Sequence, residues 1–519
     1  ALALLKNTIP ILTTTVPPKL VKQIAKIETD LKSSDSASDH KLRKIYFELR
    51  KIRRNLLLSE PALNFDSILA IHGAPPRYTS NICDQYLARW SKKGKGIVKI
   101  TAWKTSPIID NLTLSRLPAG AIQNMDLSFD GGKIVFSFAD HTPQDTEERK
   151  FFLYELNLAD SSIRQITGTS ADPDLPLDSS SIVKTEDFDP CWLPDGDILF
   201  VSTRCRTFSR CHAGRYAPTY VLHRIKEDGT CLRRISFAES NEWTPFVADD
   251  GTVVFTRWDY INRHEILFQG LWTCRPDGSG FAHLYGNSTV NPCVIGHARQ
   301  VPESKLYLAV ASAHHSITCG PLIMINPEIA EDGEESLIRL QPNMEFPETE
   351  GWPMGNCAYP LPLNKNLYLA SYSPDRTPCH WETGRYNAYG IYLFDRAGGR
   401  ELICRVHDGS LLRPIPLQKR KQPPIIADVR NEKMTNALVF VQDISNSRHD
   451  INKGIPKRIR VIRLFEQEGI IAPPRSVVGI ELAKGVVGTA SISNDGSSAF
   501  YVPADVPLLF QLVDSNNMA

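Results

Sequence analysis

The sequence predicts an all-β protein, a six-bladed β-propeller with an N-terminal helical hairpin and a C-terminal small β domain. Three observations lead to this prediction. A phrase made of an extended segment, an Asp-Gly turn and an apolar strand recurs along the chain, a second turn signal follows each copy, and amphipathic helical patterns are confined to residues 1–63. A unit of two hairpins cannot bury its faces alone, so the units are expected to pack around a shared axis.

Residues 1–63 predict the helical hairpin. Apolar residues recur at three- and four-residue spacing in 19–32 and again in 41–58, while Lys, Arg and Glu fill the remaining faces. The polar run 33–39 between them is typical of a turn. We therefore expect two antiparallel helices.

Residues 64–405 predict the propeller. The hairpin phrase occurs at 126–136, 190–200 and 245–255, each time with an Asp-Gly pair that suits the positive φ of a tight turn. Degenerate copies follow at 298–308 and 358–368. Together with an irregular first unit, these copies predict six blades.

The amino-acid composition of the chain changes after residue 405. Residues 406–428 are rich in Pro and Lys and predict an extended linker that crosses the propeller surface. Further apolar, β-rich runs beyond the linker predict a small β domain over 429–519.

Charge and hydropathy limit the partners. The 519 residues carry 59 Lys and Arg against 58 Asp and Glu, a formal net charge of +1. Nucleic-acid binding rests on a concentrated basic excess, so no nucleic-acid partner is expected. No apolar run approaches the about 18 residues of a membrane-spanning helix, so no membrane span is expected either.

One loop suggests a metal site. Cys205, Cys211 and His212 follow a predicted strand within a few residues of one another. Thiolate and imidazole are preferred zinc ligands, and these three side chains can supply three of four tetrahedral positions. Zinc is therefore the candidate cofactor, with a Cys205–Cys211 disulfide or two unrelated thiols as an equal alternative. No Cys-x-x-Cys-His motif occurs, so no covalent haem is expected within this chain.

Other loops carry candidate catalytic residues. Propeller loops converge at one end of the central channel, where function usually collects. A His beside a carboxylate can act there as a general base or a metal ligand, although a structural hydrogen-bonding role is the competing interpretation for each residue. The candidates are Asp84, Arg204, Asp259, His264 and His315.

Several phrases resemble a known family. They include Arg-Tyr-Thr-Ser-Asn-Ile-Cys-Asp-Gln-Tyr at 77–86, Asp-Phe-Asp-Pro-Cys-Trp-Leu-Pro-Asp-Gly at 187–196, Leu-Trp-Thr-Cys-Arg-Pro-Asp-Gly at 271–278 and Arg-Pro-Ile-Pro at 413–416. Through them nearly the whole chain resembles the alpha-subunit family of hydrazine synthase. The resemblance implies an exported protein, periplasmic or secreted, with an N-terminal propeller and a middle domain. In the hydrazine-forming enzyme a c-type haem motif comes with the middle domain, and this chain departs from that pattern.

Two functions are carried forward. The first is an exported scaffold or binding subunit of a hydrazine-synthase-like assembly, with protein partners and a metal, zinc first. The alternative is a metal-dependent enzyme that acts on a small polar substrate at the mouth of the propeller channel. A third interpretation is a plain protein-interaction propeller without chemistry, and metal analysis of the purified protein separates it from a metal-binding protein.

Overall fold

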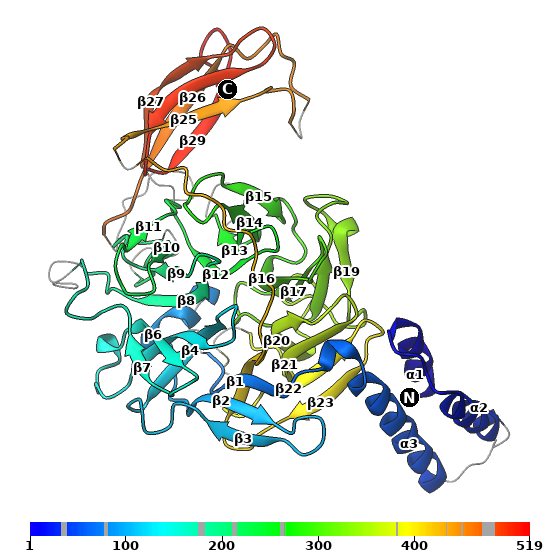
Figure 1. The fold of residues 1–519 in the computed structure, drawn as a ribbon. Helices are drawn as coiled ribbons and strands as arrows, with labels where there is room; N and C mark the ends of the chain where they lie inside the picture. The colour runs from blue at the N-terminus through cyan, green and yellow to red at the C-terminus, as the bar shows by residue number, and fades with distance from the viewer. Residues whose placement is uncertain are drawn as a thin grey trace.

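The computed structural model describes residues 1–519 except 33–38, 77–80, 175–181, 210–214, 260–263, 265, 380–381, 383, 432, 448–449 and 470–482. Three helices lie at the N-terminal end, and antiparallel sheets make up most of the remaining chain (Figure 1). The molecule is therefore mostly β, as the sequence predicts.

The N-terminal helices occupy the predicted ranges and add one element. They are α1 (Leu2–Thr8), α2 (Pro18–Lys32) and α3 (Asp39–Leu58). Ile24 and Ile27 of α2 share one buried cluster with Leu49 and Ile52 of α3, so the apolar stripes read from the sequence are the packed faces. Short 3₁₀ helices are η1 (Ile9–Ile11), η2 (Pro61–Leu63), η3 (Ile82–Tyr86), η4 (Ala88–Trp90), η5 (Thr146–Glu148) and η6 (Glu334–Ser336).

Four-stranded antiparallel sheets are the repeated unit. Three of them have the strand orders β24 (Ser410–Pro416), β1 (Ser67–Gly73), β2 (Gly96–Thr101), β3 (Ile108–Asn111); β4 (Gly120–Leu127), β5 (Lys133–Asp140), β6 (Phe151–Asn157), β7 (Ile163–Gln165); and β8 (Asp187–Trp192), β9 (Ile198–Ser202), β10 (Val221–Ile225), β11 (Arg233–Arg234). A fourth has the order β20 (Met354–Pro362), β21 (Leu367–Arg376), β22 (Gly390–Asp395), β23 (Arg400–Cys404).

An eight-stranded sheet contains two more such groups. The first group is β12 (Glu242–Val247), β13 (Val253–Trp258), β14 (Gln269–Cys274) and β15 (Ala282–Tyr285). The second is β16 (Val294–Gln300), β17 (Tyr307–Ser312), β18 (Leu322–Ile325) and β19 (Leu337–Arg339). A single parallel pair, Gln269 with Val294, joins them.

The predicted Asp-Gly hairpins are present. The β8–β9 and β12–β13 turns place Gly196 at φ +93° and Gly251 at φ +87°, conformations that glycine adopts at little cost. The preceding aspartates support these turns, since an Asp250 side-chain oxygen accepts the Thr252 N–H at 3.0 Å. Local turn chemistry thus specifies each hairpin.

The first strands of the sheets form a closed ring. Strand β4 contacts β8, β8 contacts β12, β12 contacts β16, β16 contacts β20, β20 contacts β24, and β24 contacts β4. The sheets spread outward from this ring, which is the arrangement of a β-propeller (Figure 1).

The ring closes where the sequence predicts a linker. Strand β24, within the expected linker 406–428, hydrogen-bonds to β1 and completes the first sheet. Pro414 and Pro416 made this segment resemble an extended connector. Proline is accommodated because β24 is an edge strand of its sheet and carries a bulge, so not every backbone N–H is needed for pairing.

Residues 417–429, here called the strap, run on from β24 across the hairpin turns (Figure 1). The Arg420 N–H donates to Phe129 O at 2.9 Å, and the Val429 N–H donates to the Asp277 carboxylate at 2.9 Å. The strap therefore lies against the propeller surface at the ends of the Asp-Gly hairpins.

Beyond the strap are two small sheets. One pairs β25 (Asn436–Val441) with β28 (Ser498–Pro503), and the other has the order β27 (Ala483–Ser491), β26 (Arg458–Phe465), β29 (Leu508–Val513). The Phe208 N–H donates to Gln467 O at 2.7 Å, which links this region to the propeller. Among the described residues, no helix is both long and apolar enough to cross a membrane.

Candidate functional site

The innermost strands repeat one backbone irregularity. Strands β8, β12, β16, β20 and β24 each carry a bulge in their pairing with the next strand. Each bulge contains a non-glycine residue at φ between +50° and +54°: Asp189, Thr244, His297, Tyr359 and Arg413. A positive φ at such residues costs energy and re-aims the side chain, and it recurs at functional sites.

Several of these residues contact one another, and Asn124, in the bulge of β4, joins them. Asp189 accepts a hydrogen bond from the Thr244 N–H at 2.8 Å and another from the Asn124 side-chain amide. The His297 ring stacks on the Tyr359 ring with centroids 4.0 Å apart. The bulges thus place a polar layer in the middle of the strand ring.

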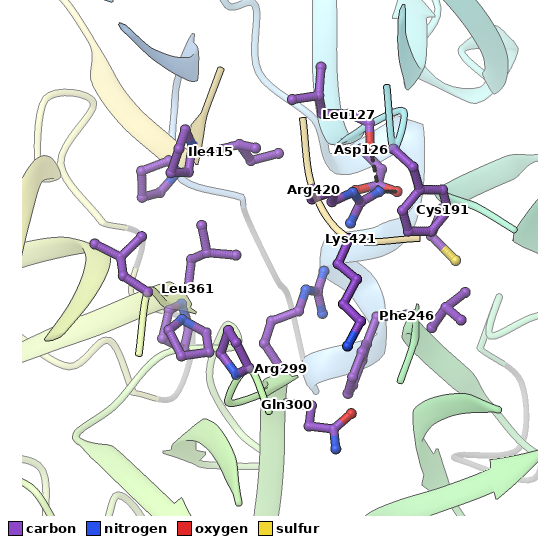
Figure 2. Close-up of a pocket in the computed structure, with 18 of the residues that line it drawn as sticks. Asp126, Leu127, Cys191, Phe246, Arg299, Gln300, Leu361, Ile415, Arg420 and Lys421 are labelled. Atoms are coloured by element: carbon purple, nitrogen blue, oxygen red, sulfur yellow. Dashed lines mark hydrogen bonds and ion pairs between the residues drawn. The ribbon is translucent and has the colours of Figure 1, made fainter. Parts of the chain in front are cut away.

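A pocket lies two residues further along each innermost strand. It encloses about 290 Å³, near the lower end of the range for ligand pockets. Figure 2 labels one lining residue from each innermost strand, in chain order Asp126, Cys191, Phe246, Arg299, Leu361 and Ile415.

The strap supplies one wall of this pocket. Gln418, Arg420 and Lys421 line it together with the strand residues. The Arg420 guanidinium lies 2.8 Å from the Asp126 carboxylate and stacks over the Phe129 ring at 4.3 Å. Figure 2 shows the Arg299 and Lys421 side chains extending into the space.

The opposite end of the ring is filled by η3. The Tyr86 ring lies against Phe188 and Trp243, with centroids 5.9 and 5.8 Å away. Gln85 exchanges two hydrogen bonds with Thr318, at 2.8 and 3.0 Å. The segment is a structural plug at the end where the innermost strands begin.

Buried carboxylates hold the plug and the residues that follow it in place. Glu186 accepts the Ala88 N–H at 2.8 Å and the Phe151 N–H at 3.3 Å. Burial raises the pKa of Glu186 to about 7, against the opposing effect of these hydrogen bonds. Asp84, a predicted catalytic residue, is buried in η3 and forms an ion pair with Arg215.

The predicted Arg204 lies in a different ion-pair cluster. Its guanidinium contacts Asp172, Asp174 and Asp187, each at 2.7 Å. Although burial alone would lower it, the charge of Asp187 and the hydrogen bonds of Asp172 raise the pKa of Arg204. This geometry crosslinks the loops around β8.

The other predicted catalytic residues also have local partners. Asp259 accepts a hydrogen bond from Arg257 Nε at 2.9 Å. The exposed His264 ring accepts the Ile266 N–H at 3.2 Å. His315 pairs through Nδ1 with Glu348, and this contact helps hold the Glu348 pKa below its usual value although burial opposes it.

Strand connectivity places these candidates at the plug end, because each lies in the plug or in the loop after the second strand of its sheet. The predicted catalytic residues therefore share the plug end of the ring, but their ion pairs and hydrogen bonds belong to separate local networks.

The predicted zinc ligands are only partly described. Cys211 and His212 lie outside the described residues. The Cys205 thiol donates to Thr219 O at 3.2 Å, and burial raises its pKa. Among the described residues, no group of three or more His, Cys, Asp or Glu side chains is arranged to hold a metal ion.

The fold is similar to that of a solved hydrazine synthase. The structure titled "Kuenenia stuttgartiensis Hydrazine Synthase" aligns with a TM-score of 0.65 and 15% identity, covering 88% of this chain and 66% of that chain. This chain thus shares the fold over most of its length while spanning just under two thirds of the hydrazine synthase chain.

More distant similarities accompany it. TolB from Acinetobacter baumannii aligns with a TM-score of 0.39 and 11% identity, covering 67% of this chain and 66% of that chain. The tricorn protease aligns with a TM-score of 0.37 and 14% identity, covering 64% and 26%. No protein-family model matches the sequence, and no curated protein matches it.

Sequence reasoning missed the pocket at the other end of the ring. A signal was present, since four of the five bulged residues precede a proline: Asp189-Pro190, Thr244-Pro245, Tyr359-Pro360 and Arg413-Pro414. Proline within a strand marks an edge or a bulge. Its recurrence in the repeated phrases could have located the polar layer.

Proposed function

We propose that the chain is an exported, periplasmic or secreted, six-bladed propeller that acts as a scaffold or binding subunit of a hydrazine-synthase-like assembly. The similarity to the hydrazine synthase chain supports the scaffold. The family resemblance of the sequence motivates export and assembly.

The strand ring supports the proposed count of six blades. Its members are β4, β8, β12, β16, β20 and β24, and each begins one four-stranded group. The eight-stranded sheet divides into two blades because only the Gln269–Val294 pair crosses between its halves.

An exposed apolar face carries the assembly proposal. On the β25–β28 ribbon, Leu438, Phe440 and Tyr501 expose 61%, 69% and 67% of their surface. Leu438 and Tyr501 are directly opposite in register, and Phe440 lies two residues further on the same face. Clustered apolar side chains on a sheet face favour burial against a partner, which we assign as another subunit.

The test is the mass of the assembled protein. The full tagged chain is expressed in its native host and purified from the exported fraction. Native mass spectrometry is expected to detect it in a complex with a stoichiometric partner. A variant with Leu438→Ser, Phe440→Ser and Tyr501→Ser is expected to lose that partner while keeping its circular dichroism spectrum.

The control carries Ile329→Ser and Ile338→Ser, two exposed positions of the propeller. Monomeric wild-type protein, or a partner that the triple variant retains, would contradict the assembly role.

We further propose that Cys205, Cys211 and His212 bind zinc. Binding requires loss of the Cys205 proton and of its hydrogen bond to Thr219. Metal analysis is expected to find one zinc per chain in wild-type protein and none in the Cys211→Ser variant. Protein purified without chelators that contains no zinc, or a mass showing a Cys205–Cys211 disulfide, would refute it.

A further inference from the structure

The strap-covered pocket contains more cationic than anionic groups. The cationic side chains that line the pocket are those of Arg299, Arg413, Arg420 and Lys421. Two carboxylates also line it. Asp126 is already engaged by Arg420 and accepts the Trp192 backbone N–H at 3.0 Å, and Asp249 accepts the Glu303 backbone N–H at 2.8 Å. The excess positive charge therefore resides on Arg299, Arg413 and Lys421.

Arg299 and Arg413 make their hydrogen bonds to backbone carbonyls. Arg299 Nη1 donates to Ala298 O at 2.6 Å, and Arg413 Nε donates to Met125 O. Within the described part of the chain, neither guanidinium forms an ion pair with a carboxylate. Arg413 is nevertheless 94% buried, since only 6% of it is exposed. A buried cation without an ionic partner is costly.

Burial also disfavours the charged form of both arginines. Burial, followed by the charge of Arg413, lowers the pKa of Arg299 to about 9. Burial likewise lowers the pKa of Arg413. Asp126 of β4 and Asp189 of β8 oppose both effects without cancelling them. A bound anion would relieve this repulsion.

The pocket also has an apolar wall and lies against Trp192. The buried Trp192 indole N–H has no hydrogen-bond partner in the described residues, and Trp192 lines the pocket. Phe246, Leu361 and Ile415 supply apolar surface. The Phe246 ring lies 5.2 Å from the Arg299 guanidinium carbon and helps fix its plane.

We infer that this pocket binds a small organic acid, with the carboxylate held by Arg299 and Arg413 and the carbon skeleton packed against Phe246, Leu361 and Ile415. Guanidinium groups suit this task because their fork of N–H donors matches a carboxylate. The site lies at the end of the ring opposite the plug, so it is separate from the predicted catalytic and zinc residues.

Calorimetric titration of the full chain tests this inference, with benzoate as the probe and benzamide as its uncharged isostere. One benzoate per chain is expected to bind, at least tenfold more tightly than benzamide. Arg299→Gln is expected to weaken benzoate binding at least tenfold. Arg299→Lys, which keeps the charge but loses the fork, is expected to weaken it less.

Arg164→Gln is the matched control, because Arg164 is exposed on a different part of the propeller. It is expected to leave benzoate affinity unchanged. Arg413→Gln adds a second measurement, accepted when its circular dichroism spectrum matches wild type. Equal binding of benzoate and benzamide, or full benzoate affinity in Arg299→Gln, would overturn the site. Binding of inorganic phosphate without benzoate would overturn the assignment to an organic acid.

Discussion

The Arg420 guanidinium of the strap lies 2.8 Å from the carboxylate of Asp126 on the innermost strand β4. This ion pair joins the segment that leaves the propeller to the strand ring that the segment covers. The contact is partly exposed, so its contribution to global stability is below about 1 kcal/mol. Its effect is expected in the local opening of the strap.

Asp126→Asn is therefore expected to loosen the strap without unfolding the propeller. The substitution leaves the tryptic sites Lys419, Arg420 and Lys421 intact, so cleavage there reports local opening. Limited trypsinolysis with peptide mapping should show several-fold faster cleavage than in wild type. Asp375→Asn, which breaks the exposed pair with Arg385 elsewhere, is the control. Unchanged cleavage within the strap would contradict the predicted anchoring role.

Arg53 is predicted to dock helix α3 onto the propeller. Its guanidinium is buried between Asp395 of β22 and Glu401 of β23. Arg53→Ala leaves both carboxylates without this partner, and losing one side of a buried pair costs about 3–5 kcal/mol. A clearly lower unfolding midpoint in a thermal or urea scan is expected.

Arg54→Ala is the matched control for that experiment. Arg54 neighbours Arg53 on the same helix but donates to the Leu402 carbonyl at the surface, at 2.8 Å. Its loss is expected to cost about 1 kcal/mol or less. Equal midpoints for the two variants would show that the buried pair does not hold the helix.

Glu186 is predicted to make stability depend on pH. Burial raises its pKa in the folded state to about 7, from an ordinary value of 4.5, so the folded state binds the proton more tightly between these values. The Glu186 contribution to stability therefore falls as pH rises from about 4.5 to 7, by up to about 3 kcal/mol.

Glu186→Gln removes this titration while retaining an oxygen acceptor for the Ala88 N–H. The midpoint of the variant, relative to wild type, is expected to rise between pH 5 and pH 8 in thermal scans. Glu303→Gln, an exposed carboxylate without a buried role, is expected to show no such trend. A constant difference between Glu186→Gln and wild type would contradict the raised pKa.

Cys231 is predicted to be the fast-reacting thiol among the described cysteines. It is exposed, whereas the other described cysteines are buried or partly buried. Burial also raises the pKa of Cys83 to about 11 and that of Cys293 to about 12, which lowers their thiolate fraction. Cys231→Ser should remove one equivalent from the fast phase of labelling with a disulfide reagent.

The Cys211→Ser variant is labelled in parallel, since that residue lies outside the described part of the chain. Buried thiols are expected to react only after denaturation. A fast phase that Cys231→Ser leaves unchanged would show that another cysteine is accessible.

The sequence by itself determined the local elements. The apolar spacing in 19–32 and 41–58 predicted α2 and α3, and Asp195-Gly196 predicted the β8–β9 turn. These elements depend on neighbours a few residues apart, so periodicity and turn chemistry suffice.

The tertiary structure alone decided the closure and the pocket. Pairing of β24 with β1 depends on a contact between the two ends of the propeller chain, which no local pattern encodes. The same closure brings Arg299 and Arg413 from distant segments into one space. Burial and the closeness of a second guanidinium, rather than residue type, distinguish Arg299 from arginines on the surface.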